Sequence, residues 1–187
     1  MKSVAVYCGS AHGDNPAFAS AARALGEEIA RRGINLVYGG GKVGLMGEVA
    51  TAVLNAGGTA TGVIPHQLAD KEMAHAGLTS LEIVDTMAQR KTRMEELSDA
   101  FIALPGGIGT LEELTEVLTM QQLGHITGPV GLLDVDGYWQ PFRAMFTGFV
   151  DNGFVQRRYL DGLRITPDPA ALLDSFESWK PLGAKWD

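Results

Sequence analysis

The amino-acid sequence predicts an α/β fold, a doubly wound parallel sheet with helices on both faces, formed by one domain over residues 1–187. Two observations predict it. Short apolar runs of strand length alternate along the chain with segments in which apolar residues recur at helical spacing. The apolar runs are continuous, which is typical of parallel strands covered on both faces. No sequence repeat or low-complexity linker interrupts this alternation.

Turn and capping residues indicate where the elements begin and end. Asn15-Pro16 starts the first helix, Gly33 ends it, and Gly57-Gly58 ends the second helix. Pro65 stops the third strand because proline has no N–H for the sheet. Strands are expected over residues 3–8, 34–38, 59–64, 81–84, 100–103, 130–133 and 163–165. Helices are expected over about 16–32, 47–55, 86–97, 110–119, 138–150 and 169–179. The segment 66–79 is the least regular and is a candidate lid.

Composition excludes several classes of function. The 187 residues carry a net charge of −7, and no basic run exceeds two residues, which disfavours nucleic-acid polymers and anionic membranes as partners. No apolar run approaches the roughly 20 residues of a membrane span. The lone Cys8 excludes an intramolecular disulfide, and its strand setting predicts a small core hydrophobe. Because no signal peptide precedes the first strand, we expect a cytoplasmic protein.

The turn that begins at Pro105 is the strongest functional signal. It follows the strand at 100–103, contains Gly106, Gly107 and Gly109, and leads into a helix. Bare glycine N–H groups at a helix N-terminus form an anion site that suits a phosphate. The spacing Thr110-x-x-Glu113 also fits a capping box, in which both side chains only satisfy backbone N–H groups. The number of glycines favours the phosphate site.

Carboxylates follow this turn on one face of the helix. Glu112, Glu113, Glu116 and Thr119 lie away from the apolar stripe that should face the core. A phosphate site with carboxylates one turn further along the helix suggests chemistry on a sugar phosphate.

Two further glycine turns follow strands, after Cys8 (Gly9-Ser10) and after Tyr38 (Gly40-Gly41). Since ligands of such sheets bind at the carboxyl ends of the strands, we expect all three turns to meet at one crevice. The pattern Gly39-x-Gly41-x-x-Gly44 matches the dinucleotide fingerprint only weakly, since no acidic residue ends the next strand. Some of these glycines are explained by close packing of the helix on the strand, without a role in ligand binding.

The expected helix 86–97 places two cations, Arg90 and Lys91, on the arc that it shares with Met87 and Met94, while Glu95 falls on the opposite side. Cations that face inward need an anionic partner. The carboxylates of the 110–119 helix or a bound phosphate are the candidates. No metal site is expected, because no histidine pair has ligand spacing.

Together these motifs resemble the Lonely Guy family, nucleoside 5′-monophosphate phosphoribohydrolases that were long labelled lysine decarboxylases. The resemblance rests on Gly39-Gly40-Gly41-x-x-Gly44-Leu45-Met46-Gly47, Met87-x-x-Arg90-Lys91 and Pro105-Gly106-Gly107-x-Gly109-Thr110-x-x-Glu113. It implies a Rossmann-like fold, a homodimer, no cofactor, and cleavage of the N-glycosidic bond of AMP-like nucleotides. It also implies that Arg90 and Glu113 are the catalytic pair. The family often has a serine where this chain has Ala11. This difference removes a second hydroxyl contact to the substrate and leaves the expected reaction unchanged.

The expected substrate contacts combine the turns with the resemblance. They are Gly9, Ser10, Gly40, Gly41, Glu72, Met87, Lys91, Gly106, Gly107, Ile108, Gly109, Thr110, Leu111, Glu112 and Thr119. Cleavage passes through an oxocarbenium-like sugar, so Glu113 is open to three roles: base, nucleophile or electrostatic stabiliser. The base of the nucleotide, adenine or an N6-modified adenine, stays open as well.

Two alternatives are a non-catalytic nucleotide or cofactor carrier on the same fold and an amino-acid decarboxylase. A carrier does not need a carboxylate beside the sugar. Pyridoxal chemistry needs a Schiff-base lysine, and only Lys42 and Lys91 are candidates, without a recognisable setting.

Overall fold

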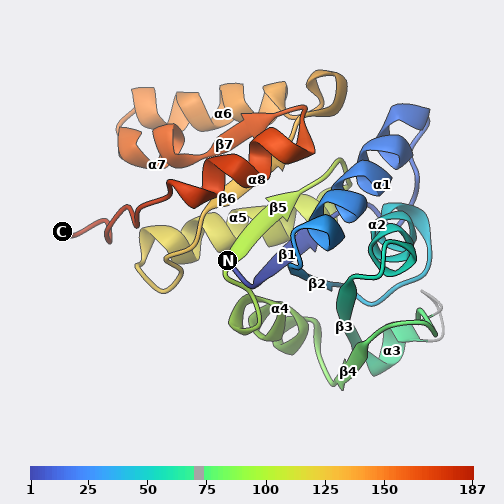
Figure 1. Ribbon diagram of the computed structural model, residues 1–187. Helices are drawn as coiled ribbons and strands as arrows, with labels where there is room; N and C mark the ends of the chain where they lie inside the picture. The colour runs from blue at the N-terminus through green and yellow to red at the C-terminus, as the bar shows by residue number, and fades with distance from the viewer. Residues whose placement is uncertain (70–73) are drawn as a thin grey trace.

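The computed structural model describes residues 1–69 and 74–187 and has the predicted doubly wound, Rossmann-like α/β fold (Figure 1). The strands are β1 (Ser3–Tyr7), β2 (Asn35–Tyr38), β3 (Thr59–Pro65), β4 (Ser80–Val84), β5 (Ala100–Ala103), β6 (Val130–Leu133) and β7 (Arg164–Thr166). They form a parallel sheet in the order β4-β3-β2-β1-β5-β6-β7. Because the order reverses direction between β1 and β5, the switch point lies at these two strands.

The helices cover both faces of the sheet. They are α1 (Pro16–Arg31), α2 (Gly44–Asn55), α3 (His66–Ala69), α4 (Met87–Glu96), α5 (Ile108–Gln122), α6 (Gln140–Asp151), α7 (Arg157–Gly162) and α8 (Pro169–Glu177). Side chains of α1, α2 and α8 pack on one face of the sheet, and side chains of α4 to α7 pack on the other. Successive β1 residues alternate between the two cores, as Val4 and Ala5 show.

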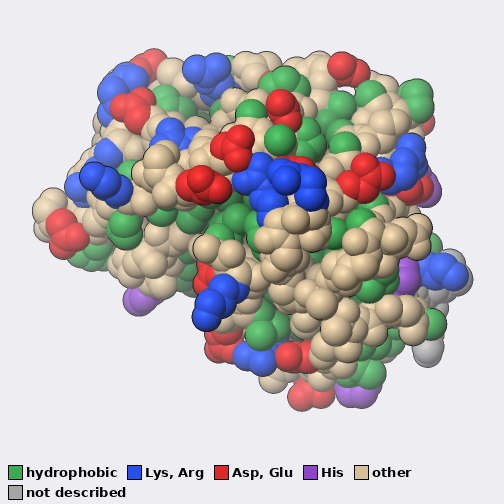
Figure 2. Space-filling view, in the orientation of Figure 1, with side chains coloured by type: hydrophobic (Ala, Val, Ile, Leu, Met, Phe, Trp, Pro, Cys, Tyr) green, Lys and Arg blue, Asp and Glu red, His purple; other side chains and the backbone are tan. Residues whose placement is uncertain are grey.

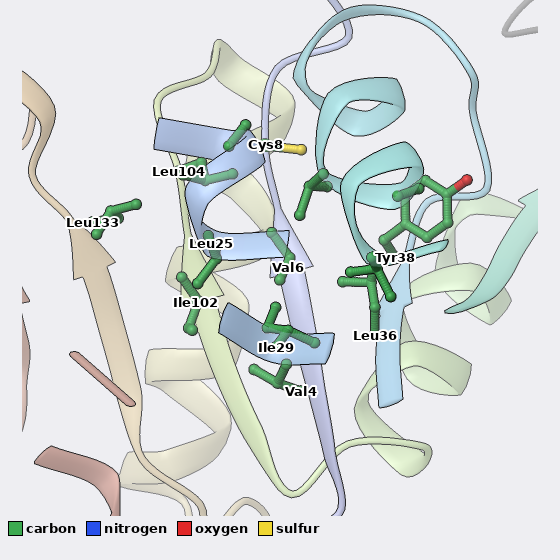
Figure 3. Close-up of a cluster of buried hydrophobic side chains, with 14 of the residues drawn as sticks. Val4, Val6, Cys8, Leu25, Ile29, Leu36, Tyr38, Ile102, Leu104 and Leu133 are labelled. Carbon is green, nitrogen blue, oxygen red and sulfur yellow. The ribbon is translucent and has the colours of Figure 1, made fainter. Parts of the chain in front are cut away.

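The core on the α1 face explains the long apolar runs of the sequence. Leu25 and Ile29 of α1 lie one turn apart and pack against Val4 and Val6 of β1 (Figure 3). Cys8 lies at the edge of the same cluster and is buried, which confirms its predicted place as a small core residue. The α1 face therefore holds β1 rigidly up to the residue where the first glycine turn begins.

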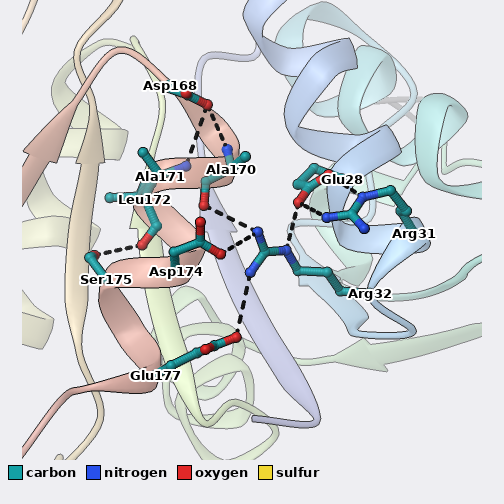
Figure 4. Close-up of polar contacts among 10 residues, drawn as sticks. All are labelled: Glu28, Arg31, Arg32, Asp168, Ala170, Ala171, Leu172, Asp174, Ser175 and Glu177. Carbon is teal, nitrogen blue, oxygen red and sulfur yellow. Dashed lines mark hydrogen bonds and ion pairs between the residues drawn. The ribbon is translucent and has the colours of Figure 1, made fainter.

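A network of ion pairs joins α1 to α8 (Figure 4). The Arg32 guanidinium lies 2.6 Å from Glu28 and 2.7 Å from Asp174, and it donates a hydrogen bond of 3.2 Å to the Ala170 carbonyl. Figure 2 shows Lys and Arg side chains gathered near this junction, flanked by Asp and Glu. Arg31 above all, together with Arg32, lowers the pKa of Glu28 to about 2. This network belongs to the fold and has no contact with the crevice described below.

The observed elements depart from the expected ones at several ends. Helix α2 begins at Gly44 and α5 at Ile108, both earlier than expected, and α7 was not expected at all. Residues 66–69 of the candidate lid form one helical turn, whereas a segment without regular structure was expected. The wrong helix starts have one physical cause, since the N-cap residues, Val43 for α2 and Gly107 for α5, have no side chain that caps a helix and so give no capping signal.

Candidate functional site

A crevice of about 320 Å³ opens at the carboxyl ends of β1 and β5. The turns after β1, β2 and β5 all reach it, as predicted. The residues of the predicted site that line it are Gly9, Ser10, Met87, Arg90, Gly107, Ile108, Gly109, Thr110, Glu112 and Glu113. It lies at the switch point of the sheet, where folds of this type bind ligands.

Backbone contacts bring the turns after β1 and β5 together. The Gly9 N–H donates to the Pro105 carbonyl at 3.1 Å, and the Gly9 carbonyl accepts from Leu45 N–H at 3.0 Å. A Cβ on Gly106 would lie 2.1 Å from the Thr110 hydroxyl oxygen, so Gly106 has no room for a side chain. Gly106 is thus explained by packing, and it does not line the crevice.

Gly107 and Gly109 have no such packing reason. A Cβ on either residue would meet nothing within 4 Å, and neither residue has a positive φ. Both line the crevice, so their missing side chains leave the backbone open to a ligand. Gly107 is the N-cap of α5, and no side chain caps this helix. The first turn of α5 therefore presents N–H groups and the positive end of a helix dipole to the crevice.

The capping-box interpretation of Thr110 and Glu113 is wrong. The N-cap is Gly107, three residues before Thr110, and no side-chain cap bond is present there. A capping box does form at α4, between Thr86 and Gln89. Glu113 lines the crevice instead.

Arg90 enters the crevice from α4 and is 5% exposed, which confirms the inward-facing cation. Its Nε donates to the Val63 carbonyl at 3.0 Å and its Nη2 to the Gly39 carbonyl at 2.7 Å. These carbonyls belong to the end of β3 and the residue after β2, so two strands fix the guanidinium plane. These bonds hold the positive charge of the guanidinium at the crevice.

Lys91 connects α4 to α5 beside the crevice. Its ammonium nitrogen contacts the Glu112 carboxylate and lies 2.8 Å from a Glu116 carboxylate oxygen. Burial acts to lower the pKa of Lys91, but the hydrogen bonds to Glu112 and Glu116 outweigh burial and raise it. Of the two candidate partners, a bound phosphate and the carboxylates of α5, the carboxylates contact Lys91.

Two protonated groups, Tyr7 and Cys8, line the crevice together with Glu113. Burial raises the pKa of the Tyr7 hydroxyl well above its usual range, and the nearby charge of Glu113 raises it further. Burial and Glu113 also raise the pKa of the Cys8 thiol, whereas Arg90 lowers it. Glu113 and Arg90, which both line the crevice, thus act on the same buried thiol with opposite signs. Cys8 stays a neutral thiol, not a nucleophile.

Several predicted contacts lie outside the lining of the crevice. They are Gly40, Gly41, Lys91, Gly106, Leu111 and Thr119. Gly40 has a structural reason, since its φ is +78° and a Cβ would lie 3.2 Å from Ile64. The Thr119 hydroxyl donates to the Thr115 carbonyl at 2.7 Å. Glu72 lies outside the described residues.

Sequence reasoning missed several lining residues. Gly39, rather than Gly40 or Gly41, faces the crevice, together with Met46, Leu68 and Met94. Leu68 belongs to the candidate lid, so this segment does reach the crevice. The position of Gly39 directly after β2 could have identified it, but the sequence does not distinguish it from the two glycines that follow.

Residues 1–69 and 74–187 contain neither a metal-binding cluster nor a membrane-spanning helix. No group of three or more His, Cys, Asp or Glu side chains in these ranges could hold a metal ion. No helix in the same ranges is long and apolar enough to cross a membrane.

Known proteins match the chain over most of its length. Residues 46–176 match the family model described as "Possible lysine decarboxylase". The chain is 44% identical over 182 residues to a cytokinin riboside 5′-monophosphate phosphoribohydrolase of Arabidopsis thaliana, covering 97% of this chain and 80% of that protein. It is 44% identical over 193 residues to one of Oryza sativa subsp. japonica, covering 100% and 78%.

Solved structures share the fold at lower identity. The molybdenum cofactor binding protein from Rippkaea orientalis matches with a TM-score of 0.72 and 23% identity, over 95% of this chain and 96% of that chain. The Moco carrier protein from Chlamydomonas reinhardtii matches with a TM-score of 0.70 and 21% identity, over the same shares. At this identity these structures support the fold alone.

Proposed function

The chain belongs to the family of the cytokinin riboside 5′-monophosphate phosphoribohydrolases, and from that premise we propose that it hydrolyses the N-glycosidic bond of nucleoside 5′-monophosphates. The products are a free base and ribose 5-phosphate. One observation carries the proposal: Glu113 and Arg90 share one crevice with a glycine turn that is open to a phosphate.

The turn anchors the 5′-phosphate. Gly107 and Gly109 let the phosphate approach the backbone, and the N-terminus of α5 stabilises its charge. Binding energy from the phosphate then fixes the ribose relative to the protein, so the glycosidic bond is positioned before it breaks. A nucleoside without a phosphate loses this anchor.

Glu113 faces the sugar and stabilises the positive charge that develops at C1′ as the bond to the base breaks. The carboxylate stands one helical turn beyond Gly109, so phosphate and carboxylate contact opposite parts of one ribose 5-phosphate group. It also orients or deprotonates the attacking water. Tyr7 and Cys8, which line the same crevice, are neutral, so they add no competing charge to the site.

Arg90 holds the reacting group in place. Its two carbonyl partners, on Val63 and Gly39, keep the guanidinium from turning away from the crevice. It binds ribose or phosphate oxygens and balances the negative charge of Glu113 and the nucleotide.

Neither alternative function gains support. The cofactor carriers share the fold only, and mere binding does not require Glu113 beside a sugar. A decarboxylase needs an unprotonated lysine as a nucleophile. Lys91 is engaged by two carboxylates that raise its pKa, so it is a poor Schiff-base former.

A homodimer, which the family resemblance implies, is part of the proposal. Met94 of α4 and Val117 and Leu118 of α5 are buried in the core of the chain itself, so they are not interface residues. Among the exposed apolar residues, Met87, at 44%, and Ile108, at 82%, border the crevice. A partner subunit that covers them would also enclose the site. Light scattering should give about 40 kDa, twice the 19.9 kDa of one chain, and a value of one chain mass contradicts the dimer.

The substrate assay tests the reaction itself. The purified protein is incubated with AMP, with the N6-prenylated monophosphate and with the two matching nucleosides, and products are separated by chromatography. We expect free base from the monophosphates only. Equal turnover of adenosine and AMP contradicts the phosphate anchor, and release of carbon dioxide from lysine supports the decarboxylase instead.

A further inference from the structure

The turn that holds the phosphate in the proposed function is braced from outside by Tyr138. The Tyr138 hydroxyl donates a hydrogen bond to the Gly106 carbonyl, across 32 positions of sequence. Tyr138 does not line the crevice. It borders a separate apolar groove that also includes Gly106 and Gly107. Gly107 lines both the crevice and the groove, so it lies between them.

This bond controls the direction of one N–H group. The peptide bond between Gly106 and Gly107 is trans, so the Gly106 carbonyl and the Gly107 N–H point in opposite directions. With the carbonyl held toward Tyr138, the Gly107 N–H points away from the groove, toward the crevice. Because both residues are glycines, the backbone alone would allow this peptide to rotate.

Tyr138 is itself firmly placed. The Asp134 carboxylate accepts a hydrogen bond from the Trp139 N–H at 2.7 Å and another from the Gln140 amide. The ring of Tyr138 packs edge-to-face on Phe18, at 5.4 Å between ring centres.

The turn before Tyr138 is anchored as well. Asp136 adopts the unfavourable φ of +50°, and the Asn15 amide donates to its carboxylate at 2.8 Å. A strained non-glycine residue persists where the surroundings over-determine it. Contacts from the loops after β1 and β6 thus hold the Tyr138 hydroxyl in position to bond to the Gly106 carbonyl.

We propose that Tyr138 is a positioning residue, which fixes the Gly106–Gly107 peptide so that the Gly107 N–H is directed at the phosphate of the substrate. The inference rests on the proposed phosphate site. Tyr138 has no contact with the crevice, so it acts only through this peptide. Its hydroxyl therefore contributes to recognition of the phosphate and not to recognition of the base.

The test is Tyr138→Phe, which removes the hydroxyl and keeps the ring contacts with Phe18 and Trp139. The matched control is Tyr159→Phe. The Tyr159 hydroxyl also donates to a glycine carbonyl, that of Gly183, at 2.9 Å, and Tyr159 is absent from the crevice lining. Binding of ribose 5-phosphate by calorimetry is measured for both variants, together with KM and kcat for AMP.

We expect Tyr138→Phe to weaken ribose 5-phosphate binding about tenfold and to raise KM for AMP by a similar factor, since one charge-assisted hydrogen bond loses its alignment. The kcat should change by less than about twofold, because the phosphate is bound equally in ground and transition states. Binding of adenine should not change. Tyr159→Phe should match the wild type in all of these measurements.

Two outcomes overturn the inference: wild-type ribose 5-phosphate affinity in Tyr138→Phe, or an equal loss of affinity for adenine and for ribose 5-phosphate. Failure of the proposed function has a different signature. In that case the wild type releases no base from AMP, while the calorimetric comparison of Tyr138→Phe with the wild type still decides whether Tyr138 orients an anion site.

Discussion

Arg90 occupies the space that a side chain on Gly39 would need. Its Nη2 donates a hydrogen bond of 2.7 Å to the Gly39 carbonyl, and a Cβ built on Gly39 would lie 1.9 Å from the same nitrogen. Gly39 has no positive φ, so backbone conformation does not require glycine here. Glycine is required at position 39 because the Arg90 guanidinium fills the space of a side chain. Gly39 is therefore as much a part of the site as Arg90.

Gly39→Ala should therefore displace Arg90 and lower kcat/KM for AMP by about 10²–10³-fold, the usual cost of losing one electrostatic contact to a transition state. The variant should still fold, because the atom nearest to the new Cβ is at the end of the Arg90 side chain, which can move aside. Steady-state kinetics and a circular dichroism melt on the same sample measure both effects.

The matched control is Gly148→Ala in α6, where a Cβ would meet nothing within 4 Å. This variant should keep wild-type kinetics and gain up to about 1 kcal/mol of stability, as alanine favours the helix. If Gly39→Ala keeps kcat/KM within about twofold of wild type, the position of Arg90 does not matter to the reaction.

Glu95 supplies a prediction about pH. Burial raises its pKa, the neighbouring Glu116 raises it further, and Lys91 opposes both. Its Oε1 is buried and lacks a hydrogen-bond partner among the described residues. A carboxyl whose pKa is raised on folding stabilises the protein at pH values below its usual pKa of 4.5, and this contribution is lost as pH rises through the folded value.

Glu95→Gln should accordingly raise Tm relative to wild type at pH 7, and the difference should shrink toward pH 4. Glu96→Gln is the control. Glu96 is an exposed neighbour that pairs with Arg93 at 3.0 Å, so its loss should not stabilise the protein. A Tm difference for Glu95→Gln that is equal at both pH values would show that Glu95 is not strained by its burial.

The Arg32 network should matter to stability and not to catalysis. Arg32→Leu removes contacts to Glu28, Asp174 and Ala170 and should cost about 1 kcal/mol, or about 2–4 °C in Tm. Kinetic parameters for AMP should stay at wild-type values. A fall in kcat/KM would mean that the junction of α1 with α8 is coupled to the crevice.

The pH dependence of this variant follows from Glu28. A carboxyl whose pKa is lowered on folding stabilises the protein above its usual 4.5, and the contribution is lost as pH falls through about 2. The stability difference between wild type and Arg32→Leu should therefore shrink between these two pH values. Arg31 remains beside Glu28 in the variant, so part of the pH dependence should persist.

The sequence predicted the sheet and the convergence of three turns because both depend on local signals. Continuous apolar runs indicate parallel strands, and the carboxyl ends of parallel strands meet at one edge. The inward position of Arg90 followed from helical periodicity. Such patterns repeat along one element and do not require knowledge of its neighbours.

The remainder of the site depends on contacts between distant segments. Helical periodicity placed Glu95 on the outer side of α4, but the charge of Glu116 on α5 lies close to it. No local pattern connects Tyr138 to Gly106, because the loops after β5 and β6 meet only in the folded sheet. Likewise, three consecutive glycines cannot reveal which one faces the crevice, since that choice is made by the guanidinium of Arg90.

The central claim is that Glu113 performs chemistry on a substrate that the α5 turn anchors, and Glu113→Gln tests it most directly. The substitution keeps the size of the side chain and removes its charge. The kcat for AMP and the dissociation constant of AMP are measured on this variant, with Glu27→Gln on the exposed face of α1 as the control. The account predicts a kcat lower by about 10²–10⁴-fold with AMP affinity changed by less than about threefold. A Glu113→Gln enzyme with wild-type kcat would contradict it.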